Sequence, residues 1–294
     1  MGKVLILGGT RYFGKRLVEL LLAEGRHEIT VATRGMAEAE FDGNVRRIIA
    51  DRTDGDSLAK LAATESWDIV YDNICFSPNE AIIAVNAFEG RVGRYVLTST
   101  LSVYGFGSSV LREEDMDPFI YPWTAAGRGE LEYGEGKRQA EAVFFQKAAF
   151  PVAAMRIPIV LGPDDYTKRL HFHVDHVKQG LPMVMPNPSA EMSFISSAET
   201  AEFLLWLGSN GLTGPVNACS EGSIALSRMM EWIEEAIGKK ANLVAEAEGE
   251  HHSPFGIPSS WTMDTSKAKA GGYRFSSAAE WLQKLIDDMA SGRV

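Results

Sequence analysis

The sequence has few cysteines, no long apolar run and too few cations to balance its acids. Cys75 and Cys219 are the only cysteines in 294 residues, which excludes a disulfide framework and favours a reducing compartment. The first apolar run, residues 4–7, is too short for a signal peptide or a membrane span. Lys and Arg number 29 against 39 Asp and Glu, a net charge of −10, so nucleic acid is an unexpected partner. We therefore expect a soluble cytoplasmic protein that does not bind membranes.

Short apolar runs alternate with segments of helical periodicity through the first half of the chain. The predicted strands are residues 4–7, 28–32, 45–49, 68–71, 95–98 and 152–156. Such alternation is typical of a parallel sheet with helices on both faces. We expect an α/β fold, a Rossmann-type doubly wound parallel sheet with a smaller C-terminal substrate lobe, and a ligand crevice at the carboxyl ends of the strands.

Prolines become frequent after residue 157, at positions 158, 163, 182, 186 and 188, which indicates a change toward loops. The sequence therefore predicts a dinucleotide-binding domain over residues 1–156, with a return to the sheet near residues 195–220. Residues 157–194 and 221–294 are predicted to form the substrate-binding lobe.

A glycine-rich turn joins the first predicted strand to the first helix. It reads Gly8-Gly-Thr-Arg-Tyr-Phe-Gly14. Glycine allows a sharp turn and a close approach to a pyrophosphate, which the helix N-terminus then attracts. The turn also matches seven positions of a P-loop, but Arg16 replaces the hydroxyl that would bind magnesium, which disfavours an ATPase or kinase. A turn without any ligand is the other alternative.

The second predicted strand ends without the carboxylate that would bind the ribose diol of NAD. Thr33 and Arg34 stand there, and an arginine at this point can pair with a 2′-phosphate, as could Arg11 in the glycine turn. NADP is therefore the favoured cofactor and NAD the alternative; Arg34 could also be a solvated loop cation. Asp51, followed by Arg52, could reach the adenine amino group or could belong to a helix-capping loop.

Tyr133 and Lys137 stand four residues apart and would share one face of a helix. A free phenol is a poor base at neutral pH, and a nearby ammonium favours its ionised form. Tyr133 could then exchange a proton with a substrate hydroxyl while a hydride moves at a nicotinamide ring. The pair precedes the sixth predicted strand and follows a hydroxyl-rich run, residues 97–105, that could orient a substrate carbonyl.

These motifs together resemble the extended short-chain dehydrogenase/reductases, the NAD-dependent epimerase/dehydratase family. The resemblance covers nearly the whole chain: the glycine turn, the hydroxyl-rich run, Tyr-x-x-x-Lys, and residues 156–163 with the sequence Arg-Ile-Pro-Ile-Val-Leu-Gly-Pro. It implies that Thr100 takes the catalytic Ser/Thr role, Tyr133 the acid/base role and Lys137 the supporting role. It also suggests a homodimer formed through helices of the first lobe.

The motifs and the resemblance together predict two further sets of contacts. The predicted cofactor contacts are Gly8, Thr10, Arg11, Tyr12, Phe13, Gly14, Arg34, Asp51, Arg52, Ile74, Cys75, Thr98, Ser99, Tyr133, Lys137, Ile157, Pro158 and Ile159. The predicted substrate contacts are Ser102, Tyr104, Lys168 and Arg169. Lys168 and Arg169 would bind an anionic group, or else begin a solvated helix.

The chain departs from the family pattern at several places. Arg11 replaces the middle glycine, a variant that resembles an atypical branch including the chloroplast stem-loop RNA-binding proteins. Ile159 stands where sugar-nucleotide epimerases have asparagine, which weakens a sugar-nucleotide interpretation. His171, His173 and His176 lack an acidic or cysteine partner at a fixed spacing, so no metal is expected.

We therefore expect an NAD(P)-dependent oxidoreductase that transfers a hydride to or from a carbonyl or alcohol of a small-molecule substrate, with a tyrosine as acid/base. The alternative is a sugar-nucleotide epimerase or dehydratase with bound NAD. From another class, a non-catalytic cofactor- or RNA-binding protein on the same scaffold would also fit the fold.

Overall fold

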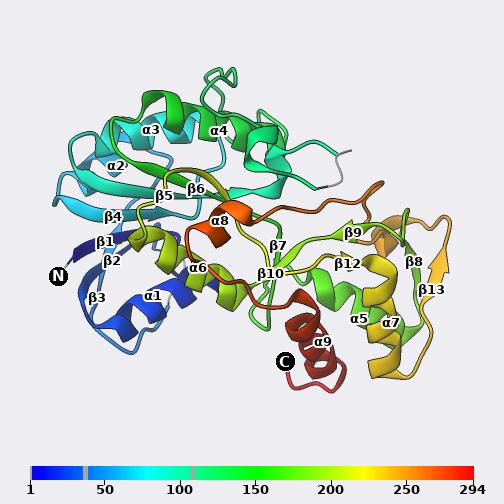
Figure 1. The fold of residues 1–294 in the computed structure, drawn as a ribbon. Coiled ribbons are helices and arrows are strands. Elements are labelled where there is room, and N and C mark those ends of the chain that lie inside the picture. Colours follow the sequence, from blue (N-terminus) through cyan, green and yellow to red (C-terminus); the bar gives the residue numbers. More distant parts are fainter. Residues whose placement is uncertain (1, 36–38, 107–109) are drawn as a thin grey trace.

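A computed structural model describes residues 2–35, 39–106 and 110–294, and its main feature is a seven-stranded parallel sheet (Figure 1). The strand order is β11-β6-β5-β4-β1-β2-β3. The bounds are β1 (Gly2–Leu7), β2 (His27–Thr33), β3 (Val45–Ile49), β4 (Trp67–Asp72), β5 (Val92–Thr100), β6 (Val152–Ile157) and β11 (Gly214–Asn217). The predicted doubly wound Rossmann-type fold is confirmed.

Helices cover both faces of this sheet because its strands are apolar on both sides. Helices α2 (Gly55–Ala62), α3 (Pro78–Phe88) and α4 (Tyr133–Lys147) lie on one face, and α1 (Tyr12–Glu24) and α6 (Ser197–Ser209) lie on the other (Figure 1). Two separate apolar clusters fill the layers. Leu58, Ala84 and Phe144 belong to the first, and Leu17 and Leu204 to the second.

The chain order reverses beside the central strand β1, which pairs with β2 on one side and with β4 on the other. Neighbouring strands at such a reversal send their connections to opposite faces of the sheet. Their carboxyl ends therefore separate and leave a crevice. This reversal places the glycine turn, which follows β1, at the mouth of the crevice.

The remaining elements form a smaller lobe beside the carboxyl ends of the strands (Figure 1). It contains helices α5 (Arg169–Gln179), α7 (Leu226–Ile237) and α9 (Ala278–Ala290), which enclose an apolar cluster that includes Met229 and Leu282. Three strand pairs complete it: β7 (Ile159–Leu161) with β10 (Phe194–Ser196), β9 (Glu191–Met192) with β12 (Ile224–Ala225), and β8 (Pro182–Val184) with β13 (Asn242–Val244). The short helix α8 (Ser266–Ala270) contacts β11. Within the described ranges, none of the helices is both long and apolar enough to cross a bilayer.

Candidate functional site

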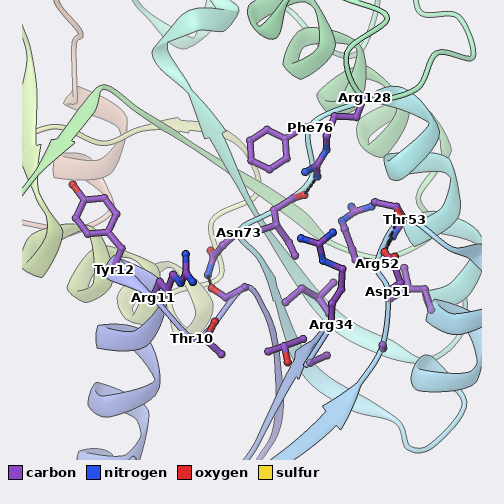
Figure 2. Close-up of a pocket in the computed structure, with 18 of the residues that line it drawn as sticks. Thr10, Arg11, Tyr12, Arg34, Asp51, Arg52, Thr53, Asn73, Phe76 and Arg128 are labelled. Atoms are coloured by element: carbon purple, nitrogen blue, oxygen red, sulfur yellow. Dashed lines mark hydrogen bonds between the residues drawn. The ribbon is translucent and has the colours of Figure 1, made fainter. Parts of the chain in front are cut away.

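A pocket of about 430 Å³ opens at the carboxyl ends of β1, β2, β3 and β4 (Figure 2). Ten of the residues predicted to contact a cofactor line it: Gly8, Thr10, Arg11, Tyr12, Phe13, Gly14, Arg34, Asp51, Arg52 and Ile74. Ten further lining residues were not predicted as site residues: the apolar Leu7, Ala32, Ala50 and Leu58, and Thr33, Thr53, Asn73, Phe76, Arg128 and Tyr166. The pocket volume lies in the range of small-molecule and cofactor sites.

The glycine turn leaves the N-terminus of α1 open toward this pocket. Arg11, the residue before the helix, has extended backbone angles and makes no capping hydrogen bond with its side chain. The first turn of α1 contains no acidic residue that would neutralise the helix dipole. A Cβ on Gly14 would lie 2.1 Å from the carbonyl oxygen of Gly8, so only glycine allows the strand and the helix to approach this closely. The turn is therefore suited to a phosphate group.

The far end of the pocket carries one carboxylate among cations. The Asp51 carboxylate accepts hydrogen bonds from the Thr53 backbone N–H at 2.9 Å and from its hydroxyl at 2.7 Å. These bonds, together with the nearby Arg34 and Arg128, lower the pKa of Asp51. The Thr33 hydroxyl accepts a hydrogen bond from the backbone N–H of Gly35. Thr33, Arg34 and Gly35, the last described residues at the end of β2, carry no carboxylate.

Arg52 has a different role from the one predicted. Its guanidinium is buried against Asp72, with the two side chains 4% and 0% exposed, and its Nη1 donates to the Glu80 carbonyl oxygen at 2.8 Å. Tyr95 also donates to Asp72, at 2.7 Å. Burial alone would lower the pKa of Arg52, but Asp72 raises it well above the usual value. Arg52 thus borders the pocket as part of a neutral buried pair and is not a free cation.

The second lobe contributes one wall of the pocket. Tyr166 lines the pocket, and its ring meets that of Tyr12 edge-on with 5.8 Å between centroids. Next to it, Asp164 forms an ion pair with Arg16 of α1 at 2.7 Å. The glycine turn is therefore in direct contact with the segment that leads into the second lobe.

Lys137 lies under the pocket on α4, one helical turn after Tyr133. Its ammonium is 3% exposed and donates to the carbonyl oxygens of Cys75 at 2.7 Å and Thr98 at 2.6 Å. A lysine has three N–H donors, so one remains for a ligand. Phe76, which lines the pocket, has its ring centroid 5.2 Å from Lys137 Nζ and 6.2 Å from the Tyr133 ring. The predicted pair is thus adjacent to the pocket, with the Tyr133 side chain half-exposed.

Gly134 brings the first turn of α4 against the hydroxyl-rich segment. A Cβ at this position would lie 2.4 Å from the carbonyl oxygen of Ser102. Ser102 belongs to a single 3-10 turn, Leu101–Val103, which Thr100 caps by accepting the Ser102 N–H at 3.1 Å. The backbone of Ser102, which Thr100 caps, therefore lies against the turn that carries Tyr133. Glycine in this helix is required by close packing and does not disrupt its first turn.

Ser99 and Tyr104 do not line the pocket, and their hydroxyls belong to a buried network. Ser99 donates to Glu141, which forms a fully buried ion pair with Arg156 at 2.6 Å. Arg156 also donates to the Tyr104 hydroxyl at 2.8 Å, and that hydroxyl donates in turn to Asn217 at 2.6 Å. Burial raises the pKa of Tyr104. This buried network joins β5, α4, β6 and β11, and its members Ser99 and Glu141 are on the same strand and helix as Thr100 and Lys137.

The other predicted contacts fall outside the lining of the pocket. Cys75 and Thr98 contribute carbonyl oxygens to Lys137, while burial raises the pKa of the Cys75 thiol to about 12 and makes it unreactive. Thr98 donates its hydroxyl hydrogen to Asn73 at 2.7 Å. Ile157 and Pro158 are buried and Ile159 is partly buried; Lys168 and Arg169 are exposed at the start of α5. No group of three His, Cys, Asp or Glu side chains in the described segments is arranged to hold a metal ion.

The fold is of the doubly wound class, and the pocket lies where such folds bind their ligands, at the carboxyl ends of the strands. The model of the NAD dependent epimerase/dehydratase family matches residues 4–75. The Thermus thermophilus UDP-glucose 4-epimerase, solved with NAD, superimposes with a TM-score of 0.74 and 17% identity over 99% of this chain and 100% of its own. Residues 4–75 are thus similar to the NAD dependent epimerase/dehydratase family, and the whole chain shares the fold of the Thermus thermophilus epimerase.

Two curated proteins are similar over parts of the chain. The chloroplast stem-loop binding protein of 41 kDa b from Arabidopsis thaliana is 27% identical over 207 residues, which are 65% of this chain and 50% of that protein. The 2′-dehydrokanamycin reductase of Streptomyces kanamyceticus is 34% identical over 103 residues, 35% of this chain and 29% of the reductase. The matches span half or less of each relative's length.

Proposed function

We propose that this protein is an NAD(P)-dependent oxidoreductase of the extended short-chain dehydrogenase type that acts on a carbonyl or alcohol group. The observation that carries the proposal is the position of Lys137, which is buried with two donors on strand-end carbonyls and lies one helical turn from Tyr133 and beside the pocket. An ammonium in that place serves a ligand, since its burial is costly and its third donor is unpaired among the described residues.

Each residue has a distinct task in this proposal. The open N-terminus of α1 binds the diphosphate of the cofactor, and Lys137 donates its third N–H to the hydroxyls of the nicotinamide ribose. The bound cofactor supplies or accepts the hydride. Tyr133 gives a proton to, or takes one from, the substrate oxygen. Thr100 orients the substrate oxygen by hydrogen bonding.

The proposed cofactor is NADP, with NAD as the alternative. Thr33 supplies no carboxylate to repel a 2′-phosphate, while Arg11 and Arg34 line the pocket as exposed cations. Asp51 would meet the adenine amino group. The Thermus thermophilus epimerase was solved with NAD, so the preference is carried only by the residues of this chain.

A second candidate is an epimerase or dehydratase that keeps its nicotinamide bound, which the family match and the likeness to the Thermus thermophilus epimerase support. The two candidates differ in cofactor stoichiometry. A net oxidoreductase changes the nicotinamide absorbance in step with product, whereas an epimerase or dehydratase regenerates its cofactor and leaves the absorbance unchanged.

The Tyr133→Phe variant tests the proposal. We expect turnover to fall by about 100-fold or more, because the proton donor is gone. The cofactor dissociation constant should change by less than about threefold, since the predicted binding groups remain. Tyr273→Phe, which alters a phenol in the aromatic cluster of α6, is the matched control. Undiminished turnover in Tyr133→Phe would remove the catalytic assignment.

A non-catalytic RNA-binding role is the rival from another class, and the Arabidopsis relative gives it specific support. The net charge of −10 argues against it. Titration with a stem-loop RNA at several salt concentrations separates the two, because RNA binding through cations must weaken steeply with salt.

The resemblance to the extended short-chain dehydrogenase/reductases also underlies our proposals for the oligomeric state and for the domain boundaries. We propose a homodimer through first-lobe helices, which sedimentation equilibrium would measure. The proposed division places the dinucleotide-binding domain in residues 1–156 with a return near 195–220, and the substrate lobe in residues 157–194 and 221–294.

A further inference from the structure

Arg128 reaches the cofactor pocket from a connection far away in sequence. It precedes α4 and lies on the opposite side of the pocket from β2 (Figure 2). Its Nε donates to Glu80 Oε1 at 2.8 Å, and its Nη2 donates to Glu80 Oε2 at 3.2 Å and to the Ile74 carbonyl oxygen at 2.9 Å. The guanidinium also lies over the Phe76 ring, with 4.3 Å from Cζ to the centroid. These contacts hold an otherwise half-exposed side chain in one orientation.

Glu80, which holds the Arg128 guanidinium, is itself fixed in position. Glu80 is 3% exposed and accepts the Phe76 backbone N–H at 2.7 Å, so its position is set by α3 and by the segment that follows β4. With Nε and Nη2 of Arg128 engaged, its Nη1 makes no hydrogen bond to any described residue. Arg128 therefore presents a preformed pair of N–H donors, and little side-chain entropy is lost when a ligand accepts from them.

A second cation approaches the same part of the pocket from the end of β2. Figure 2 shows the side chains of Arg34 and Arg128 extending toward one another from opposite walls. Both guanidiniums also help to lower the pKa of Asp51, which lines the same pocket. The third guanidinium nearby, that of Arg52, is neutralised by Asp72. Arg128 is also paired, with Glu80, but its Nη1 donors stay free, and Arg34 makes no ion pair with a described residue. These two side chains therefore offer free N–H donors to a dianion at this place.

We propose that Arg34 and Arg128 form a two-sided clamp for the phosphate on the adenosine 2′-position, which makes Arg128 a specificity-determining residue for NADP over NAD. This inference rests on the proposed NADP preference and adds to it a residue from outside the β2 end. An arginine alone contacts a phosphate from one side only. Two guanidiniums on opposite sides, one of them fixed by Glu80, supply charge-assisted hydrogen bonds from two directions.

Calorimetric titration with two probes tests the clamp: 2′,5′-ADP, which carries the 2′-phosphate, and 5′-ADP, which lacks it. The wild-type protein should bind 2′,5′-ADP more tightly. Arg128→Gln should weaken 2′,5′-ADP binding by about tenfold or more and 5′-ADP binding by less than about threefold. Arg128→Lys should restore part of the loss, and Arg34→Gln should resemble Arg128→Gln.

Arg228→Gln is the matched control. Arg228 is also 52% exposed, pairs with a carboxylate and lies over a tryptophan ring, but it stands on α7, outside the pocket. The ratio of the two dissociation constants is the decisive quantity, because a general loss of folding would weaken both probes alike.

Three results would overturn the clamp, and they differ in what else they overturn. If Arg128→Gln weakens both probes equally or neither, the clamp is wrong. If Arg34→Gln alone removes the discrimination, NADP preference stands and only the role of Arg128 is lost. If the wild-type protein binds the two probes equally, the proposed NADP preference fails together with the clamp.

Discussion

The buried ion pair between Arg156 and Glu141 allows a quantitative prediction about stability. Both side chains are fully buried, and Arg156 donates to both carboxylate oxygens of Glu141. It also donates to the Tyr104 hydroxyl at 2.8 Å and to two backbone carbonyl oxygens. Burial alone would lower the pKa of Arg156, but Glu141 and Tyr104 raise it, so the guanidinium stays charged.

Arg156→Met removes the cation and leaves Glu141 buried with Ser99 as its remaining side-chain partner. An uncompensated buried carboxylate costs about 3–5 kcal/mol. That is a large share of the roughly 5–15 kcal/mol that stabilises a typical domain. Adding Glu141→Gln should recover part of the loss, because the orphaned charge is gone.

Urea denaturation measures both variants, with Arg228→Gln as the control. Arg228 and Glu231 form an exposed pair, with 52% and 53% of their side chains exposed, and such a pair contributes at most about 1 kcal/mol. If Arg156→Met cannot fold, Tyr104→Phe still removes two hydrogen bonds of the network, one from Arg156 and one to Asn217, and should cost about 1–2 kcal/mol. A loss below about 1 kcal/mol for Arg156→Met would refute the reasoning, since a buried charge would then carry no penalty.

Three further predictions concern other parts of the molecule. Gly134→Ala should lower the unfolding free energy by about 1–2 kcal/mol, because contact with Ser102 outweighs the better helix propensity of alanine, whereas Gly105→Ala, in open space, should be neutral in thermal melts. Burial lowers the pKa of His173 from 6.5 to about 3, so its contribution to stability is present above pH 6.5 and declines as the pH falls toward 3. By pH 5 the unfolding free energy, measured by urea titration, should have fallen by about 2 kcal/mol. This fall should be absent in His173→Gln. Lys137→Met should weaken NADP binding by about tenfold but leave 2′,5′-ADP binding unchanged in calorimetry, since that probe lacks the nicotinamide ribose.

The central sheet was predictable because local signals coincide along this part of the chain. Residues 4–7 and 152–156 are apolar runs next to helical periodicity, and they became β1 and β6 within two residues. The glycine turn was equally visible, since its position after the first strand requires the close approach that Gly14 permits. Apolar residues that recur every two or every 3.6 positions mark the buried side of a strand or a helix, and burial determines where these elements form.

The roles of polar side chains were harder to predict than their positions. Ser99 and Thr100 are neighbours in a run of hydroxyls, yet Ser99 bonds the buried Glu141 and Thr100 caps a turn beside Tyr133. Sequence does not show which face of a strand end meets a buried carboxylate. The ion pair of Arg52 was also invisible in the sequence, because its partner Asp72 lies on β4, twenty residues further along the chain.

Residues that reach the pocket from distant segments gave almost no signal in the sequence. Arg128 lies between Gly127 and Gly129 in a long connection, and its contacts with Glu80 and Phe76 depend on how that connection crosses α3. Tyr166 enters from the second lobe. The two glycines that flank Arg128 were the one available hint, since they indicate a turn that presents a side chain.

A crystal structure of the protein with bound NADP tests the central claim most directly. The account predicts that the diphosphate lies at the glycine turn, that the third N–H of Lys137 donates to a hydroxyl of the nicotinamide ribose, and that the Tyr133 hydroxyl faces the nicotinamide ring across an open substrate space. A dinucleotide bound elsewhere, or one whose nicotinamide ring extends away from α4, would contradict it.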